Sequence, residues 1–318
     1  TGVENTAVGL RALRANTTSN NNTAVGYYAL DANTAADNTA VGSHALDANT
    51  SGTQNTAVGG SALGANTTAN NNSAFGYGAL TSNTTGANNT GLGHKSLLVN
   101  TTGGRNTAVG TFSLDANTTA SQNTAVGYQS LSSLTTGQYN TAMGDEALFS
   151  TTTASGNTAF GNDAAYSTTT GHSNIVIGFE AMNNATAVNK SVVIGYQAMK
   201  VHTGVGDEFN VIIGHSAGLA ETTGYGNTFV GGEAGKSITT GNHNTFFGKS
   251  SGGGATTGSF NICLGREAAP SSTTASNECT LGDSNIGTLR CNDTSISSLS
   301  DERDKTEIVD LPIGLDFI

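Results

Sequence analysis

Carboxylates recur at one position of a repeated sequence, where they could form a glycosidase pair or a cation site. The chain repeats a segment of the form Asn-Thr-Ala-Val-Gly, first at residues 5–9, and its closing glycine returns almost every 17 residues. Glu146, Asp163 and Glu180 each stand two residues after that glycine, in three successive repeats. If the repeats stack as coils, these side chains lie about 5 Å apart, the separation of the two carboxylates in retaining glycosidases.

A second set of charged residues stands five positions after the glycine. Asp31 and Asp47 share this position, and Arg14 precedes them in the same column, where it could neutralise one of them. The chain has no tryptophan and few aromatic residues to form the floor of a sugar site. We therefore expect solvated surface charge in both columns, with cation or sugar binding and glycan degradation as the alternatives.

The period of the glycines predicts the architecture that must position these residues. A fixed repeat this short, carried by one strand and a turn, is typical of a solenoid in which each repeat is one coil. We therefore predict an all-β parallel β-roll or β-solenoid of about 17 coils. The closing glycines have one step of 16 and one of 19, and stand at 9, 26, 42, 59, 76, 93, 110, 127, 144, 161, 178, 195, 214, 231, 248, 265 and 282.

Two apolar columns are expected to form the inside of the roll. The residue before the glycine is never polar, and a leucine stands four residues after the glycine in most of the early coils. The alanine two residues before the glycine must face away from the first column, because neighbouring strand residues point to opposite faces. A second buried face requires a partner, so we predict an obligate homotrimer, intertwined or side by side. The threonine column shares the valine face, which argues against an exposed ice-binding array.

Other columns predict turns and ladders. The glycine suits a sharp corner with positive φ or close backbone approach. The asparagine column, broken at Ser191, suits amides that hydrogen-bond from coil to coil, and the alternative is an ion held on the trimer axis by three amides. The stretch Ala-Leu-x-x-Asn-Thr-Thr-Gly lacks clean alternation, so it could be a short helical turn or a second strand.

Charge and composition exclude several classes of partner. The net charge is −11 with basic residues scattered singly, and no apolar run approaches the roughly 20 residues that span a bilayer, so we expect no nucleic-acid partner and no membrane insertion. Cys263, Cys279 and Cys291 form no CxxC pair and are interpreted as small buried residues, with Cys263 and Cys279 on opposite faces. No metal or cofactor is expected, since the histidines lack metal-ligand spacing: His44, His94, His172, His202, His215 and His243.

The repeat changes near residue 200. Residues 1–204 follow Gly-x-x-Ala-Leu and residues 205–284 follow Gly-x-x-Ala-Gly, with the 19-residue step and its Asp207 and Glu208 at the junction. A bulge or a change of roll diameter is expected there. The period stops after residue 284, and residues 285–299 form a polar connector.

The last segment, 300–318, begins Ser-Asp-Glu-Arg-Asp-Lys-Thr-Glu-Ile. It resembles the opening of the intramolecular chaperone domain of phage tailspikes and tail fibres, the endosialidase-type or S74 peptidase family, whose motif is Ser-Asp-x-Arg-x-Lys-x-x-Ile. The resemblance implies that Ser300 and Lys305 form the self-cleavage dyad. A lysine whose pKa is lowered by burial can take the serine proton, and the hydroxyl can then attack its own backbone carbonyl.

The repeats themselves resemble the Asn-Thr-Ala-Val-Gly arrays of phage and large-virus fibre proteins. More distantly, they are similar to the β-roll heads of trimeric autotransporter adhesins. These resemblances imply a trimeric virion tail fibre that contacts other tail proteins and a host glycan or protein receptor, with no enzymatic activity apart from cleavage at Ser300. The alternatives are a bacterial surface adhesin and a glycan-degrading tailspike.

Overall fold

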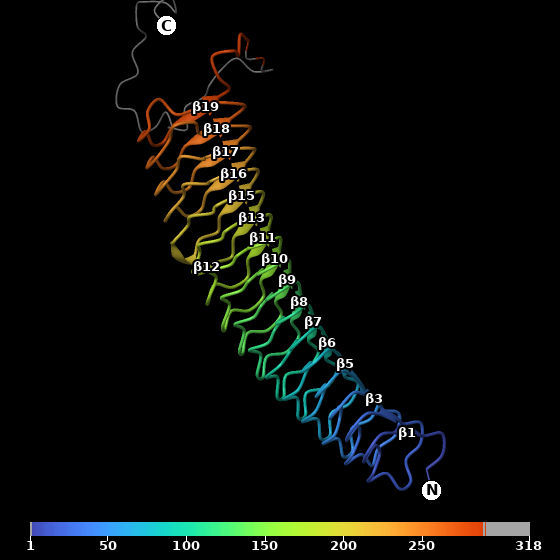
Figure 1. The fold of residues 1–318 in the computed structure, drawn as a ribbon. Helices are drawn as coiled ribbons and strands as arrows, with labels where there is room; N and C mark the ends of the chain where they lie inside the picture. Colours follow the sequence, from blue (N-terminus) through green and yellow to red (C-terminus); the bar gives the residue numbers. More distant parts are fainter. Residues whose placement is uncertain (1, 289, 291–318) are drawn as a thin grey trace, which may run out of the picture. The chain divides into compact units, whose positions relative to one another are not determined.

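A computed structural model of the chain describes residues 2–288 and 290, and these residues fold as a parallel β-solenoid (Figure 1). Seventeen three-residue strands lie side by side in one parallel sheet, with equivalent residues of successive coils in register, as Thr6 with Thr23. The prediction of an all-β solenoid of about 17 coils is confirmed.

The strands of this sheet follow the sequence order, apart from two that pair elsewhere. They are β1 (Thr6–Val8), β2 (Thr23–Val25), β3 (Thr39–Val41), β4 (Thr56–Val58), β5 (Ser73–Phe75), β6 (Thr90–Leu92), β7 (Thr107–Val109), β8 (Thr124–Val126), β9 (Thr141–Met143), β10 (Thr158–Phe160), β11 (Ile175–Ile177), β13 (Val192–Ile194), β15 (Val211–Ile213), β16 (Thr228–Val230), β17 (Thr245–Phe247), β18 (Ile262–Leu264) and β19 (Cys279–Leu281). The other two, β12 (Ala187–Asn189) and β14 (Val205–Asp207), form a separate two-stranded parallel sheet.

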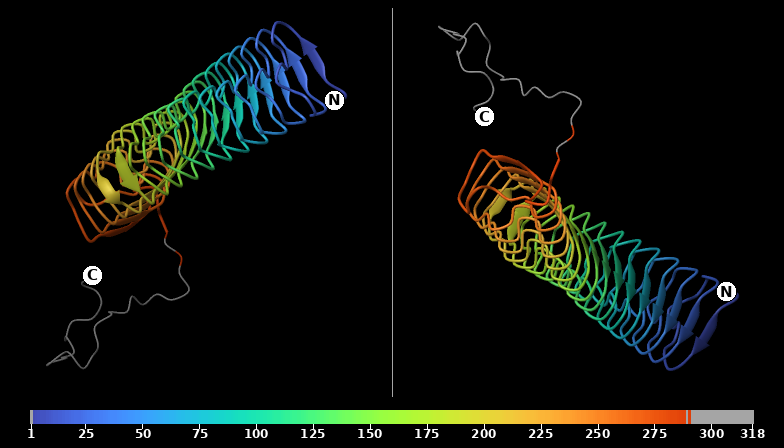
Figure 2. Two further views of the ribbon diagram at one scale, coloured as in Figure 1. Left: turned by 90° about the horizontal axis from the view of Figure 1, so that it is seen from below. Right: turned by 90° about the horizontal axis from the view of Figure 1, so that it is seen from above.

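Hydrogen bonds between successive coils hold the stack together. Within β3 and its turn, the amide of Gly42 donates to the carbonyl of Val25 at 2.8 Å, and the amide of Leu46 donates to the carbonyl of Ala62 at 3.0 Å. Each coil thus bonds to the coil before it and to the coil after it. Figure 2 shows the coils following one another at close, regular spacing from the blue to the orange part of the chain.

The turn after each strand is neither a helix nor a second strand, the two forms that the sequence left open. It is a run of tight turns in which the second and fourth residues after the glycine have positive φ, as at His44 (57°) and Leu46 (50°). The corner glycine behaves as predicted. Gly42 has φ 138°, and a Cβ placed on it would lie 2.5 Å from the carbonyl oxygen of Gly59 in the next coil.

The prediction that the valine column, the residue before each glycine, faces the inside of the roll is wrong. From β2 onward the alanine two residues before the glycine is buried, as Ala40 and Ala57 are, together with the leucine column, whereas Ala7 in the first coil is exposed. The residue before the glycine points outward, and Leu92, Phe160 and Phe247 are 47%, 53% and 59% exposed. Leucine from one wall fills the space beside the strand, and the facing position is small in these coils: a Cβ at Gly91 would lie 3.0 Å from Ser96 Oγ and 3.4 Å from Leu80.

The asparagine ladder is confirmed, and it lies inside the coil. The backbone amide of Asn55 donates to the side-chain oxygen of Asn38 at 3.0 Å, and the side-chain amide of Asn55 donates to the carbonyl of Ala69 at 2.8 Å. At the break in the column, the hydroxyl of Ser191 takes the place of the asparagine side-chain oxygen and accepts a hydrogen bond from the backbone amide of Asn210 at 3.3 Å. These amides are therefore used within one chain and cannot hold an ion between three chains.

The change of repeat is an exchange of volume between two facing positions. In the coils of β16 and β17 phenylalanine replaces the buried alanine and glycine replaces the leucine, and the rings of Phe229 and Phe246 stack at 5.0 Å. A Cβ at Gly235 would lie 2.5 Å from the ring of Phe229. At the 19-residue step, where a bulge or a change of diameter was expected, the structure has the extra strand pair β12–β14.

The exchange can be tested with Phe229→Ala and Gly235→Leu. Phe229→Ala should cost about 3–5 kcal/mol through the cavity it leaves, and Gly235→Leu should cost at least about 1–3 kcal/mol through overpacking. The double variant recreates an early coil, in which leucine accepts this same positive φ, and should recover most of both losses in urea unfolding followed by circular dichroism. A double variant no more stable than the weaker single variant would show that the two positions do not compensate.

Candidate functional site

The outward side chains of the strands form a continuous uncharged surface, which we call the strand face. It consists of the first and third residue of every strand from β1 to β11 and in β13 and β15 to β19, and none of these residues is charged. The chain as a whole carries a net charge of −11, so the lack of charged residues distinguishes this surface. Depletion of charged residues is typical of the centre of a protein interface. Its large exposed apolar members are Val8, Val41, Phe75, Leu92, Met143, Phe160, Ile175, Phe247, Ile262, Leu264 and Leu281.

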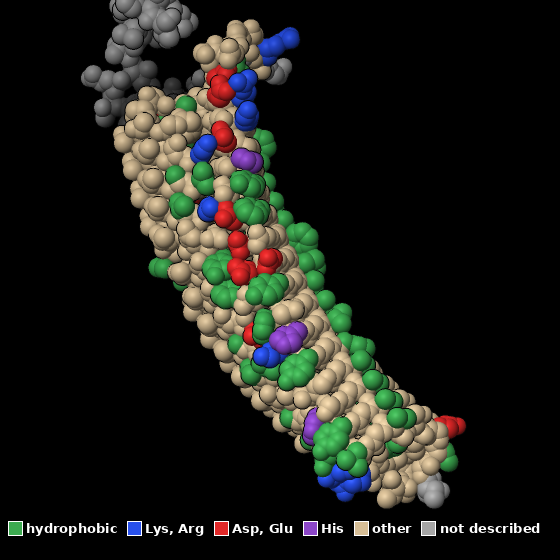
Figure 3. Space-filling model, viewed as in Figure 1, with side chains coloured by type: hydrophobic (Ala, Val, Ile, Leu, Met, Phe, Trp, Pro, Cys, Tyr) green, Lys and Arg blue, Asp and Glu red, His purple; other side chains and the backbone are tan. Residues whose placement is uncertain are grey.

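Charged and aromatic side chains gather on a different surface, over the turns. Figure 3 shows a row of apolar side chains along the edge of the stack where the strands lie, and a second row with most of the visible charged groups. The charged row is built from the second and fifth residues after each glycine, so its members are neighbours within a coil and between coils. Glu233 and Lys236, for example, form an ion pair at 3.1 Å in one coil.

The three carboxylates predicted as a column do lie in successive coils of this row. Burial and the neighbouring Asp163 raise the pKa of Glu146, and burial and Glu180 raise the pKa of Asp163. Glu180 differs, because Lys200 and Gln197 each donate to it at 2.6 Å and lower its pKa.

These carboxylates sit on the open side of the rod rather than in a cleft. Their neighbours are stacked rings, with Phe149 against Tyr166 at 5.1 Å and Phe179 against Tyr196 at 5.4 Å. The rings face one another along the stack, so their faces cover each other. The geometry fits a solvated surface with local ion pairing, which is the interpretation that the sequence favoured.

Asp31 is neutralised by Arg14, as the sequence suggested, and by a second arginine that the sequence reading missed. Arg14 Nε lies 2.8 Å from Asp31 Oδ1, and Arg11 Nη2 lies 3.0 Å from Asp31 Oδ2. The hydrogen bond from Arg14 lowers the pKa of Asp31 against the effect of burial. Asp47 instead contacts His44, whose Nδ1 lies 2.8 Å from its carboxylate. Both aspartates are therefore parts of structural pairs.

Within residues 2–288 and 290, no group of histidine, cysteine and acidic residues has the geometry of a metal site. Cys263 is buried and Cys279 is exposed, so their opposite orientation is confirmed, whereas the interpretation of Cys279 as buried is wrong. Cys291, Ser300 and Lys305 lie outside the described residues. The part of the chain that the structure describes contains no helix able to cross a lipid bilayer.

Sequence reasoning missed a second buried asparagine column, seven residues after the glycine. The side-chain amide of Asn66 donates to the side-chain oxygen of Asn49 at 2.9 Å, and the same bond recurs through Asn117. Asn66, Asn83, Asn100 and Asn117 belong to Asn-Thr-Thr sequons, yet they are fully buried and so are closed to glycosylation in the folded chain. The signal was their fixed spacing from the glycine.

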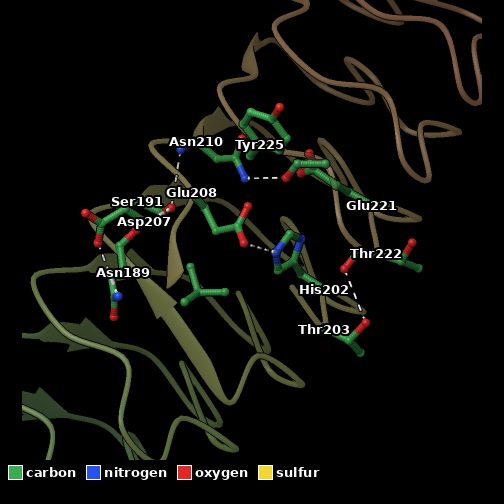
Figure 4. A network of polar contacts seen from close by, with 12 residues as sticks. Asn189, Ser191, His202, Thr203, Asp207, Glu208, Asn210, Glu221, Thr222 and Tyr225 are labelled. Atoms are coloured by element: carbon green, nitrogen blue, oxygen red, sulfur yellow. Dashed lines mark hydrogen bonds and ion pairs between the residues drawn. The ribbon is translucent and has the colours of Figure 1, made fainter. Parts of the chain in front are cut away.

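Further along the same column the structure places His202 and Glu221, both fully buried, with Glu208 beside His202. We call these three residues the junction cluster, because they lie at the 19-residue step (Figure 4). Aligning the repeats on the glycine puts a histidine and a glutamate at a position that is asparagine in the early coils. That alignment was available from the sequence.

Lys200→Met should raise the pKa of Glu180, because it removes the hydrogen bond that contributes most to lowering it. Carboxyl titration by carbon NMR measures the change. Lys236→Met is the matched control, since this lysine pairs with Glu233 and should leave Glu180 unchanged. An unaltered titration of Glu180 in Lys200→Met would mean that the pair does not form in solution.

Comparison with known proteins adds no family to this geometry. A scan against known protein families finds no match, and a search of curated proteins finds none either. What the chain does must be argued from the strand face, the charged row and the junction cluster.

Proposed function

We propose that this chain is the structural shaft of a viral fibre, such as a phage tail fibre, built from three parallel copies and carrying contacts to a host receptor. The observation that carries the proposal is the strand face, an uncharged surface of threonines and apolar side chains that runs along the whole sheet. Monomeric proteins rarely expose contiguous apolar surface on this scale, and charge is depleted at the centre of interfaces. The partner that matches a surface of this length is another copy of the same stack.

The surface that calls for a partner is the valine column and not the alanine column. Each alanine is buried by the leucines of its own chain, so the coil needs no partner to cover it. The outward valine column has no cover in the single chain. Three copies rather than two are proposed because the repeats resemble trimeric fibres and adhesin heads, and a viral fibre is favoured over a bacterial adhesin because residues 300–318 resemble the chaperone domain.

The charged row would then remain on the outside of the fibre, where it is available to a host glycan or protein receptor. Its stacked rings and ion pairs vary from coil to coil, whereas the strand face stays uncharged. This division supports one surface for assembly and another for recognition.

Ice binding is a second candidate, because the threonines share the outward face. From β1 to β10 the first strand residue is threonine in nearly every coil, and these side chains lie in register one coil apart. The expectation that threonine faces the core was wrong, so it no longer argues against this function. Phe75, Leu92, Met143 and Phe160 interrupt a flat array, however, and favour packing against another chain.

The assembly can be tested with Leu92→Asp on the strand face. Sedimentation equilibrium should give three times the 31.9-kDa chain for the unaltered protein. Leu92→Asp should dissociate it, because burying an unpaired carboxylate costs several kcal/mol, on the order of 3–5. Thr85→Glu, an exposed position outside the strands, is the control and should stay trimeric. A monomeric unaltered chain would refute the proposal, and thermal hysteresis in that monomer would favour ice binding.

Self-cleavage at Ser300 can be tested in a chain that carries the complete chaperone domain. We expect the mass under denaturing conditions to correspond to chains ending at Ser300, because the hydroxyl attacks its own backbone with Lys305 as the base. Ser300→Ala should leave the chain at full length, and Ser298→Ala should cleave normally. An uncut chain with the natural serine would contradict the assignment.

A further inference from the structure

The junction cluster places three ionisable side chains in a core whose other buried residues are mostly apolar, asparagine, serine or threonine. His202 and Glu221 are 0% exposed and Glu208 is 5% exposed. In the column of the first two, the preceding coil has Ala185 and the following coil has Ile238, both fully buried. The cluster is therefore bounded along the stack by apolar residues.

The polar atoms of the cluster are incompletely paired. His202 Nε2 lies 3.9 Å from Glu208 Oε1, which is an ion-pair contact without a hydrogen bond, and neither ring nitrogen of His202 has a hydrogen-bond partner. One oxygen of Glu208 and one of Glu221 are also unpartnered. The other oxygen of Glu221 accepts from the side-chain amide of Asn227 at 2.6 Å. A buried polar atom without a hydrogen-bond partner destabilises the folded state, because it has given up its hydrogen bonds to water without replacing them.

The charged side chains around the cluster pair with one another. On the outer side Lys190 pairs with Asp207, and Lys236 in the following coil pairs with Glu233. His243 lies against the backbone of Gly226, where its ring is stacked with Phe260.

Glu208 faces the imidazole of His202, whereas the carboxyl of Glu221 has the neutral side-chain amide of Asn227 as its hydrogen-bond donor. Burial raises the pKa of Glu221 to about 8, against the lowering effect of its bond from Asn227, and the charge of Glu208 raises it further.

The coil that contains the cluster is also the least regular one. The asparagine ladder passes through Ser191 here, with the longer 3.3 Å bond from Asn210, and two extra residues leave Val205 70% exposed. A Cβ on Gly204 would lie 2.5 Å from His202 Nε2 and 2.7 Å from Glu208 Oε1, so this glycine permits the approach of the two side chains. Irregular backbone and unpaired charge coincide at one place in the stack.

We propose that the junction cluster makes this coil a proton-dependent opening point of the shaft, closed when Glu221 carries a proton and opened locally when it loses that proton. The sign follows from linkage. A carboxyl that holds its proton more tightly in the closed state stabilises that state fully below its solvated pKa, and this stability is lost as the pH rises towards the pKa of the closed state. The inference concerns a single chain and does not depend on the trimer or on a viral function.

Hydrogen exchange of the intact chain, read by mass spectrometry on peptides covering residues 203–227, tests the proposal. After correction for intrinsic rates, the opening constant of this segment should rise about tenfold per pH unit between about pH 5 and pH 8 and level off above that. Peptides from residues 55–110, whose core holds no ionisable side chain, should show no such slope.

Glu221→Gln should abolish the slope, because the amide keeps the shape and the acceptor for Asn227 but cannot ionise. Glu221→Asn, which places there the residue found in the early coils, should do the same. Glu233→Gln, an exposed carboxyl in the next coil, is the control and should retain the slope. A slope that persists in both Glu221 variants, or no slope in the unaltered chain, would overturn the proposal.

Discussion

Every feature of this chain depends on hydrogen bonding between coils in register. The backbone of one coil bonds to the next at the spacing of a β-sheet, so each side chain has the equivalent side chains of neighbouring coils about 4.8 Å away. A residue type is accepted at a position only if it can lie beside its own copies. Asparagine satisfies this condition by bonding to the asparagine of the preceding coil, as Asn55 does to Asn38. Rings satisfy it by stacking, as Phe229 does on Phe246.

Charged side chains are poorly suited to lie beside their own copies, and the distribution of charge along the stack reflects this. Like charges one coil apart repel, and the acidic residues instead pair with basic residues of neighbouring coils, as Glu180 does with Lys200 and Asp31 with Arg11 and Arg14. Where no such partner reaches, as at Glu146 and Asp163, the pKa rises instead. The strand face avoids the difficulty by carrying no charge.

The narrow coil is filled by side chains of its own walls, which leaves the outer surfaces for the assembly and recognition that we propose. In the early coils one wall contributes alanine and the other leucine, and both side chains are buried between the walls. When phenylalanine takes the place of alanine, glycine must take the place of leucine. A protein built in this way acts through its surfaces and through the length and stiffness of its stack, which agrees with a structural role.

The sequence alone was sufficient for the class of fold, the corner glycine and the asparagine ladder. Each of these follows from period and residue type, because a 17-residue repeat can stack in only a few ways and only glycine fits a corner such as Gly42. The pairing of Arg14 with Asp31 was also readable, since it needs only adjacency in one column. The sequence did not decide which side of the strand faces inward, because valine and alanine are both apolar and alternate by one residue.

The tertiary structure decided that question through volume. Where the turn brings a leucine such as Leu46 across the coil, alanine fills the facing strand position, as Ala40 does, and the valine beside it points outward. The same three-dimensional closeness revealed that Glu208 lies beside His202 although the two belong to different parts of the coil. Column spacing describes neighbours along the stack. Contacts across the coil depend on how the turn folds back, and no period in the sequence specifies that.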